Sequence, residues 1–450
     1  MVLSWNTAIT VFFLPGHPAL WMFMAVINFG IAILHRIVQK RQAFLPAPSI
    51  ALTLLALLAI VLLTAKFRGG AGVQALGSST YGGKAYYYII ASIIGYFALI
   101  SQPIPPERAK LYVVMFLLPG VLGALSHLVY YAGPAFYFLY LIIPAGFAGG
   151  QALSANAPIT RLGGFWTAAT AISHCLLAVY GIRGIFQKWW RIALLVAVLA
   201  LGALGGYRSF LVLFFLVFAF VFVLEGLLRS PLFPALLLVG ALGFTVLIPV
   251  ASKLPAAVQR TLSFLPLKID SSIRNDANGS IDWRLQIWEA MLPELPKYVW
   301  FGKGYAMDPM DIYLTQQAVL RGRAPDYEGS ILAGDYHSGP LSTYVPFGSF
   351  GLLAFLAFLT VSARALQQNY RYGRAEMQTH NRFLYAYFLT RMIFFIFMFG
   401  SLFSDLYQFV GTIGLSIALN NGICRKPAPV PKPVRFRPDL ELRPAQPRVA

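Results

Sequence analysis

The chain has 450 residues, of which 58% are hydrophobic and 11% charged, and its mean hydropathy is +0.67. Soluble domains carry roughly 25% charged residues, so these values exclude a soluble globular domain. Several apolar runs reach the ~20 residues that cross a bilayer as a helix, which predicts an all-α, polytopic membrane protein. The formal charge of +19 does not indicate a nucleic-acid partner, because the surplus lies in short connections and in the C-terminal tail.

Residues 1–251 are predicted to be N-terminal transmembrane helices. Lys and Arg gather on alternate connections between the apolar runs, as they do on cytoplasmic loops. Basic residues follow the first apolar run instead of preceding it, so the pattern is not that of a cleavable signal peptide. The predicted spans are residues 19–38, 49–65, 86–100, 111–131, 165–182, 192–206, 210–228 and 232–250.

Residues 135–147 do not fit this alternation. Thirteen residues are few for a span, and Pro134 and Pro144 interrupt the run. The basic residues at 183–191 place the end of the next span in the cytoplasm, so 135–147 cannot be a simple crossing after the preceding span. We interpret it as a re-entrant or surface-lying segment; the alternative is a misjudged neighbouring span.

Residues 252–341 form a long polar loop, predicted to be periplasmic and catalytic. It carries nine basic and ten acidic residues and is therefore nearly neutral. Ser280–Tyr298 is predicted to be an amphipathic helix, and Phe301-Gly302-Lys303-Gly304-Tyr305 is typical of a turn that ends it. Arg284 is one position away from the apolar stripe of this helix, which is Ile281, Leu285, Trp288 and Leu292.

Residues 342–424 are predicted to be C-terminal transmembrane helices, with spans at 342–363, 383–403 and 406–423. The total is eleven or twelve spans. Residues 425–450, rich in Pro, Lys and Arg, are expected to be a disordered basic cytoplasmic tail. Cys175 and Cys424 are far apart and show neither a disulfide framework nor a metal-ligand spacing.

Three polar side chains are predicted to meet at the outer membrane surface: Arg208, Arg284 and His337. Each alone has a structural interpretation. Arg208 could snorkel at a helix corner, Arg284 could pair with Asp282 or Glu289, and His337 could cap a helix. Together they suit group transfer from a diphosphate donor to an alcohol. Arginines hold phosphate oxygens in bidentate fashion and stabilise the leaving diphosphate, and a histidine can accept a hydroxyl proton.

The loop has no closely spaced acidic pair of the Asp-x-Asp kind, so we expect no divalent cation and no cofactor. A site of this kind needs only the two arginines and the histidine in one place. The sequence motifs around them appear in a fixed order. They are Gly205-Gly206-Tyr207-Arg208-Ser209, then Arg284-x-x-x-Trp288, the Phe301–Tyr305 turn, His337-Ser338 and Gly348-x-x-Gly351.

This ordered set, over residues 190–365, resembles the O-antigen ligase and polymerase superfamily of bacterial inner membranes. The resemblance implies an inverting, metal-independent glycosyltransferase that moves an undecaprenyl-diphosphate-linked glycan to an acceptor at the periplasmic face of the inner membrane. It assigns the diphosphate to Arg208 and Arg284, and activation of the acceptor hydroxyl to His337. Many relatives have asparagine after the histidine, whereas this chain has Ser338.

The predicted partners are the lipid-linked glycan donor, a glycan or lipid A–core acceptor, and membrane lipids. Residues beside the motifs are expected to contact substrate: Arg161, Tyr207, Trp288, Lys303, Tyr305 and Tyr336. A ligase and a polymerase would share the donor site and differ in the acceptor. The single long loop holding Arg284 and His337 favours the ligase. A lipid or glycan transporter is a further alternative, but its ionisable groups would usually lie near the bilayer midplane. An envelope scaffold would not need Arg208.

Overall fold

The computed structural model describes residues 1–426, except residues 15, 39–45, 71, 73–77 and 146–160. These residues form helices and no strand, which confirms the predicted all-α fold. Extended backbone segments pair at two isolated bridges. Nearly all of the predicted tail lies outside the described residues. Eight helices or helix runs are long and apolar enough to cross a membrane: α1 (Leu20–Val38), α2 (Pro48–Phe67), α3 (Gly83–Ile100), Pro106–Ala132, α7 (Gly163–Phe186), Leu232–Lys253, α15 (Gly339–Tyr372) and α17 (Leu402–Asn420).

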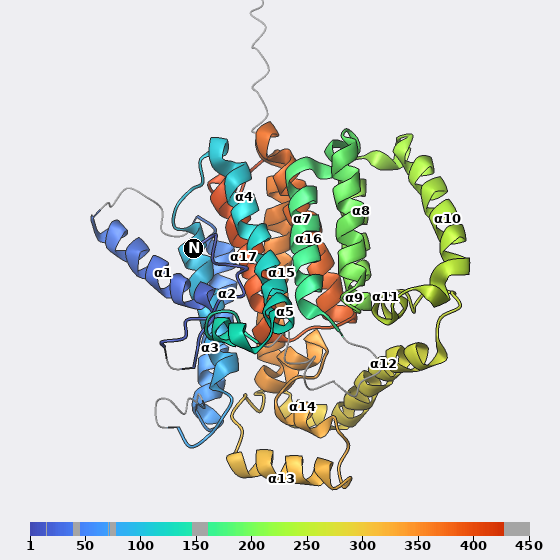
Figure 1. Cartoon of the computed structure of the whole chain (residues 1–450). Coiled ribbons are helices and arrows are strands. Elements are labelled where there is room, and N and C mark those ends of the chain that lie inside the picture. Colours follow the sequence, from blue (N-terminus) through green and yellow to red (C-terminus); the bar gives the residue numbers. More distant parts are fainter. Residues whose placement is uncertain (15, 39–45, 71, 73–77, 146–160, 427–450) are drawn as a thin grey trace, which may run out of the picture.

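The described residues thus hold eight candidate spans by length and composition, where eleven or twelve were predicted. The difference lies in three further helices that run alongside the others (Figure 1). Two are apolar but short, α8 (Trp189–Ala203) and α9 (Arg208–Leu224). The third, α16 (Gln378–Phe397), has the length of a span but carries His380, Arg382 and Arg391.

Pro106–Ala132 is not one straight helix. It contains α4 (Ala109–Leu117), a 3-10 segment η3 (Leu118–Leu122) and α5 (Gly123–Ala132). The next segment, η4 (Pro134–Leu141), is a 3-10 helix packed against α5. At a rise of about 2 Å per residue it reaches roughly 16 Å, too little for a bilayer, in line with the prediction that this run is not a simple crossing.

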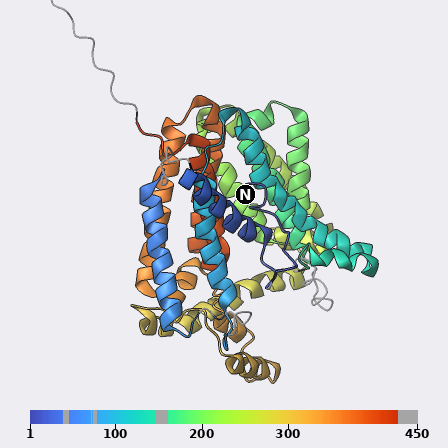
Figure 2. The same ribbon diagram turned by 90° about the vertical axis from the view of Figure 1, so that its left-hand side faces the viewer.

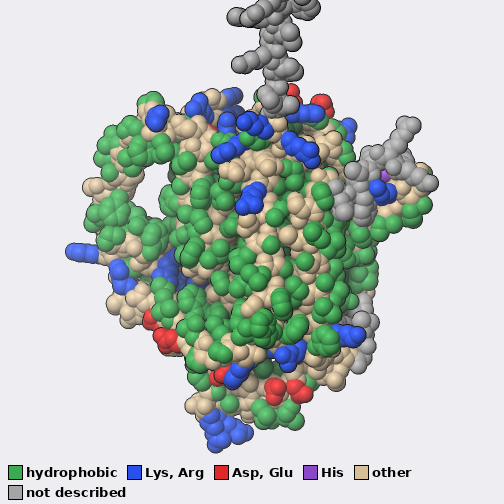
Figure 3. Space-filling model, turned by 180° about the vertical axis from the view of Figure 1, so that it is seen from behind, with side chains coloured by type: hydrophobic (Ala, Val, Ile, Leu, Met, Phe, Trp, Pro, Cys, Tyr) green, Lys and Arg blue, Asp and Glu red, His purple; other side chains and the backbone are tan. Residues whose placement is uncertain are grey.

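The core of the bundle lies where α17 and α15 pack against α2, α3 and α16. Buried aromatic rings fill it, as shown by Phe355, Phe395 and Phe409, whose centroids lie 5.2–5.9 Å apart. Helix α10 (Leu232–Val250) is the opposite case, since none of its residues is buried. Seen from behind, an opening separates α10 from the rest of the molecule (Figure 3).

The polar loop between α10 and α15 lies at one end of the bundle, here named the loop end, in both ribbon views (Figures 1 and 2). Its helices are α11 (Ala256–Thr261), α12 (Ser271–Met291), α13 (Pro309–Leu320) and α14 (Glu328–Leu332), with the 3-10 helix η7 (Leu292–Tyr298) after α12. The connections from α7 to α8, from α9 to α10 and from α15 to α16 lie at the other end.

The predicted amphipathic helix Ser280–Tyr298 is wrong in its bounds and in its buried face. Helix α12 begins at Ser271, where Asp270 caps it by accepting from the Ser272 amide, and it ends at Met291. Ile281 and Leu285 are each 44% exposed. The inward stripe is Ala277, Ser280, Arg284, Ile287 and Met291, at helical spacings of three and four. Arg284 therefore lies on the stripe that faces the protein.

Phe301–Tyr305 does more than end a helix. Helix α15 is broken at Gly348, whose φ is +66°, a conformation that glycine adopts at little cost. The carbonyls of Val345 and Pro346, left free by the break, accept from the amides of Lys303 and Gly304, at 2.9 and 3.0 Å. A Cβ on Gly302 would lie 1.9 Å from the carbonyl carbon of Pro346. The loop is thus docked into the break of the helix that follows His337.

Candidate functional site

A cavity of about 1150 Å³ opens at the loop end of the bundle. Its lining comes from helices α7, α9, α11 and α12, from helices α16 and α17, and from the N-terminal residues. Arg208, Arg284 and His337 all line this cavity, as do Arg161 and Tyr207. The structure therefore brings together residues that are up to 176 positions apart in the chain.

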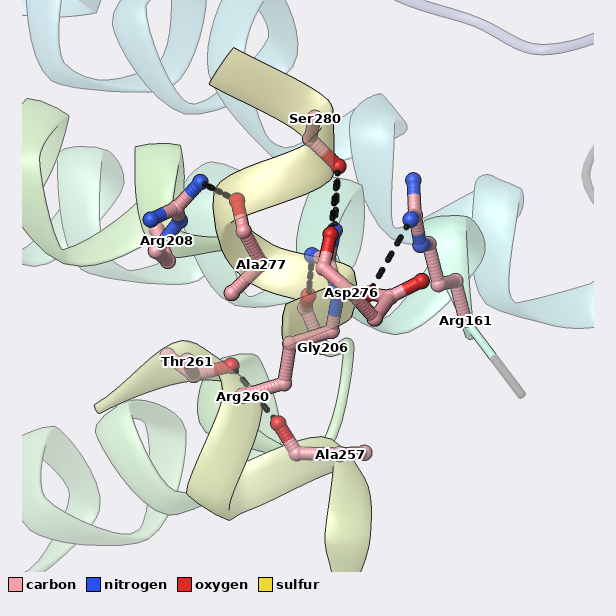
Figure 4. A network of polar contacts seen from close by, with 9 residues as sticks. All are labelled: Arg161, Gly206, Arg208, Ala257, Arg260, Thr261, Asp276, Ala277 and Ser280. Carbon is pink, nitrogen blue, oxygen red and sulfur yellow. Dashed lines mark hydrogen bonds and ion pairs between the residues drawn. The ribbon is translucent and has the colours of Figure 1, made fainter. Parts of the chain in front are cut away.

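Arg260 is the anchor of the loop, and it is 4% exposed. Its Nε donates to Oδ2 of Asp276 at 2.5 Å, one Nη donates to the Gly206 carbonyl at 2.7 Å, and the other donates to Ser280 Oγ at 3.0 Å (Figure 4). One guanidinium on α11 thus ties the turn between α8 and α9 to helix α12. Arg208 follows that turn, so its position depends on this contact.

Arg208 and Arg161 reach the same part of the cavity from two other elements. Arg208 begins α9 and donates to the Ala277 carbonyl at 2.5 Å. Arg161 precedes α7, and its Nη2 lies 3.5 Å from Oδ2 of Asp276 (Figure 4). Asp276 therefore forms ion pairs with both Arg260 and Arg161. The contacts of Arg161 and Arg208 hold their guanidiniums beside the cavity.

This end of the cavity has an excess of positive charge. Four guanidiniums, from Arg161, Arg208, Arg260 and Arg284, line it together with the one carboxylate of Asp276. Burial raises the pKa of Asp276, but the hydrogen bond from Arg260 and the charges of Arg260 and Arg161 outweigh it and bring the pKa below its usual value. Burial, followed by the charges of Arg260 and Arg161, lowers the pKa of Arg284. A bound anion would relieve this repulsion.

Arg284 has one face covered by an aromatic ring. Its guanidinium carbon lies 5.5 Å from the ring centroid of Phe399, a cation–π contact that leaves the N–H groups free to donate in the plane. Phe399 also packs against the His337 ring, at 5.0 Å between centroids. The two candidate catalytic side chains therefore share Phe399 as a neighbour.

His337 is held in a strained and defined position. Its φ is +50°, a left-handed conformation that is uncommon outside glycine and often marks functional sites. The ring packs between Phe399 and Trp283, whose centroid is 4.9 Å away. Nδ1 lies 2.8 Å from Oδ1 of Asp335; a carboxylate accepts, so Nδ1 carries the proton. Nε2 has no hydrogen-bond partner among the described residues and can act as a base.

Ser338, where many relatives have asparagine, is the N-cap of α15. Its Oγ accepts from the Leu341 amide at 3.5 Å. Asparagine and serine are both favoured N-caps, so the exchange is accommodated at this position. This N-cap directly follows His337 and fixes the start of α15 at Gly339.

The other four predicted substrate contacts are not among the residues that line the cavity. Trp288 Nε1 donates to the Tyr336 carbonyl at 3.0 Å, and Lys303 Nζ donates to the Ile331 carbonyl at 3.1 Å. Tyr305 and Tyr336 are buried, 4% and 0% exposed. In this conformation these side chains support the segment that carries His337.

Four residues of the site were not singled out from the sequence: Trp283, Arg260, Asp276 and Asp335. Asp335 is two positions before His337 and Trp283 directly precedes Arg284, so proximity to a motif was a usable signal for these two. No sequence signal pointed to Arg260 or Asp276, because each was one charged residue among nineteen in a nearly neutral loop. The described residues include no group of three or more His, Cys, Asp or Glu placed to hold a metal ion.

These features define a class of protein: a multi-pass helical membrane protein with a cavity at one end of its bundle that is lined by several arginines and a histidine. The comparison with known families agrees with this description. Residues 192–356 match the sequence model of the family described as O-antigen ligase, which places this segment in that family. No curated protein matches the chain.

The match confirms the resemblance inferred over residues 190–365. It covers α8 through the first half of α15, and so includes Arg208, Arg260, Arg284 and His337. A match to this family implies a glycan-transferring enzyme and points to lipid-linked glycans as substrates. The family description does not separate ligase from polymerase activity.

The pair Arg260–Asp276 should make the stability of the protein depend on pH in acid. Because the folded pKa of Asp276 is below its usual 3.8, its contribution is fully present above about pH 3.8 and is lost as the pH falls through the lower folded value. We expect Asp276→Asn to lower the melting temperature of the detergent-solubilised protein near neutral pH, and the difference from wild type to shrink below about pH 4.

The matched control is Asp326→Asn, which removes an exposed carboxylate of the same loop. It should leave the melting temperature close to that of wild type at every pH. A difference between Asp276→Asn and wild type that stays constant down to about pH 3 would contradict a stabilising ion pair at this position.

Proposed function

We propose that this protein is an O-antigen ligase-like glycosyltransferase. It moves a glycan from undecaprenyl diphosphate to an acceptor hydroxyl at the periplasmic face of the bacterial inner membrane. The observation that supports this most directly is the convergence of Arg208, Arg284 and His337 on one cavity at the loop end of the bundle. A diphosphate site beside a base is what this transfer needs.

The donor diphosphate lies at the arginine end of the cavity. Arg208 and Arg284 donate to its oxygens, and Arg161 adds a third guanidinium. Arg260 is engaged with Asp276 and the turn at Gly206, so it positions the others instead of binding substrate. Negative charge grows on the diphosphate as the bond to the sugar breaks, and fixed guanidiniums stabilise that charge without reorganisation.

The acceptor hydroxyl is activated by His337. Nε2 takes the hydroxyl proton while the oxygen forms a bond to the anomeric carbon of the donor sugar. The bond from that carbon to the diphosphate oxygen breaks, and its electron pair leaves with the diphosphate. Asp335, on Nδ1, holds the tautomer and stabilises the imidazolium that forms. One displacement of this kind inverts the configuration at the anomeric carbon.

The polyprenyl chain of the donor would lie in the membrane beside α10. That helix has no buried residue, and an opening separates it from α8 and α9 (Figure 3). This placement is supported by the chain order, because Arg208 begins α9 and Arg260 lies in α11, which follows closely after α10. An apolar chain there would be in contact with lipid while its diphosphate reaches the guanidiniums.

Replacing the base is the central test. In a transfer assay with undecaprenyl-diphosphate-linked glycan, at matched protein amounts, His337→Ala should lower turnover by about 10²–10⁴-fold, the usual contribution of a general base. Donor affinity should change little. The assay is run once with lipid A–core as the acceptor and once with a second lipid-linked repeat unit. The acceptor that is used then separates ligase from polymerase activity.

His17→Ala is the matched control, because His17 is exposed and also has a left-handed φ, of +45°. It should transfer glycan at the wild-type rate. Wild-type turnover in His337→Ala would remove the base from the proposal and leave His337 as a residue that shapes the start of α15.

Arg284→Lys tests whether the planar guanidinium matters beyond its charge. Lysine keeps the charge but loses the bidentate fork and the stacking on Phe399, so transfer should fall on the order of 10²-fold. Arg321→Lys, at the exposed end of α13, should have no effect. EDTA should leave both proteins' rates unchanged, and a rate that depends on added divalent cation would contradict the metal-independent mechanism.

The proposed orientation rests on the basic residues of the connections opposite the loop end. Arg364, Arg371, Arg374 and Arg382 lie at or near the junction of α15 and α16, and this basic surplus supports a cytoplasmic location for that end. In a variant lacking Cys175 and Cys424, a cysteine at Ser271 should react with an impermeant maleimide in intact cells. One at Gln378 should react after lysis. Labelling of Gln378→Cys from outside would invert the topology.

A further inference from the structure

The cavity continues beyond His337 and Phe399 to a second polar wall. This wall, here named the inner wall, is made by α16, α17 and the N-terminal residues, and none of it belongs to the segment matched by the family. The residues of the inner wall line the cavity and can form hydrogen bonds. They are Asn6, Arg391, Ser404, Asp405, Tyr407 and Gln408. Asp405 is in the first turn of α17, so the inner wall is close to the loop end.

The charges of the inner wall are balanced, unlike those of the arginine end. Arg391 Nη2 donates to Oδ1 of Asp405, and Oδ2 accepts from the Ser401 amide at 2.9 Å. Arg391 Nε is buried and has no hydrogen-bond partner among the described residues. A buried ion pair stabilises a fold little by itself, and an unpaired guanidinium N–H in a cavity wall lacks the acceptor that a neutral hydroxyl would provide.

Amide and hydroxyl groups extend the inner wall. Gln408 accepts from the Tyr387 hydroxyl at 3.0 Å, and its Nε2 donates to the Tyr407 hydroxyl at 2.5 Å. Aromatic rings flank them: Trp21 and Tyr407 are stacked at 5.3 Å with an interplanar angle of 17°, and Trp5 lies 6.4 Å from Tyr407. Flat apolar faces beside groups that both donate and accept match a sugar ring, which has apolar faces and a rim of hydroxyls.

His337 contacts elements of both ends. Its ring packs against Trp283 of α12, which carries Arg284, and against Phe399 in the connection between α16 and α17, which carry the inner wall. The positive charge of the arginine end favours binding of an anion there. The inner wall has no net charge and does not attract a phosphate. A base between a donor diphosphate and a second ligand would take its proton from that second ligand.

We propose that the inner wall is a saccharide subsite that binds the acceptor sugar and presents its hydroxyl to His337. This inference rests on the proposed glycosyl transfer, and it assigns Arg391, Asp405 and Gln408 to the acceptor. The sugar's hydroxyls exchange hydrogen bonds with Asp405 and Gln408, and Arg391 holds the Asp405 carboxylate in place. The alternative, that the inner wall holds the first sugars of the donor glycan, is separated from it by the experiment.

The test measures KM for each substrate separately. Gln408→Met keeps the shape and removes the amide, and it should raise the acceptor KM by about 3- to 10-fold, the effect of one hydrogen bond. The double variant Arg391→Gln with Asp405→Asn removes both charges together and should raise it by about 10- to 100-fold. In both variants the donor KM should stay within about twofold of the wild-type value. Gln316→Met, on exposed α13, is the control and should change neither.

A second readout does not need turnover. In the variant lacking Cys175 and Cys424, a cysteine at Ser404 should react with maleimide. Core oligosaccharide released from lipid A, or a released repeat unit in the polymerase case, should protect it, whereas undecaprenyl diphosphate should not. Protection in a protein that transfers no glycan would sustain the subsite while overturning the proposed function.

Three outcomes would overturn the inference while glycan transfer stands. A rise in donor KM with acceptor KM unchanged assigns the inner wall to the donor sugars. Unchanged KM values with a lowered melting temperature assign Arg391 and Asp405 a purely structural role. Ser404→Cys labelling at the same rate with and without saccharide shows that no sugar occupies this part of the cavity.

Discussion

The buried guanidinium of Arg260 is the contact on which the site depends. It joins Asp276 on α12 to the Gly206 turn between two bundle helices. Arg208 follows that turn, and Arg284 lies two helical turns beyond Asp276 on the same helix. A buried charge that lost its partner would be strongly destabilising, so the loop cannot leave the bundle at this point without a large cost. The cavity is therefore held open by a junction whose own charges are satisfied.

The loop is fixed to the bundle a second time, at the break in α15. The break at Gly348 frees the carbonyls of Val345 and Pro346, which a continuous helix would have used, and the amides of Lys303 and Gly304 donate to them. An unpaired buried carbonyl costs free energy comparable to a lost hydrogen bond, so helix and loop stabilise each other. His337 lies just before this helix, and its strained backbone is supported by the same contacts.

The two ends of the cavity differ in charge, and this difference gives the site a direction. Guanidiniums in excess of carboxylates favour an anion at one end. A balanced pair with amides and aromatic rings favours a neutral polyol at the other. Between them His337 has one nitrogen bound to Asp335 and the other facing the cavity. In the proposed reaction, the proton and the glycan therefore move in opposite directions along one channel.

The sequence by itself determined the membrane class, the polar loop and the three candidate catalytic residues, because apolar runs, charge asymmetry and motif order are local properties. It misplaced the buried face of α12, since Ile281 and Leu285 look inward by hydropathy yet are exposed outside the bundle. It also passed over Arg260, Asp276 and Arg391, whose roles exist only through partners 14 to 115 residues away. Tertiary structure decided which charges are buried together, because burial of a charge depends on distant elements that close around it.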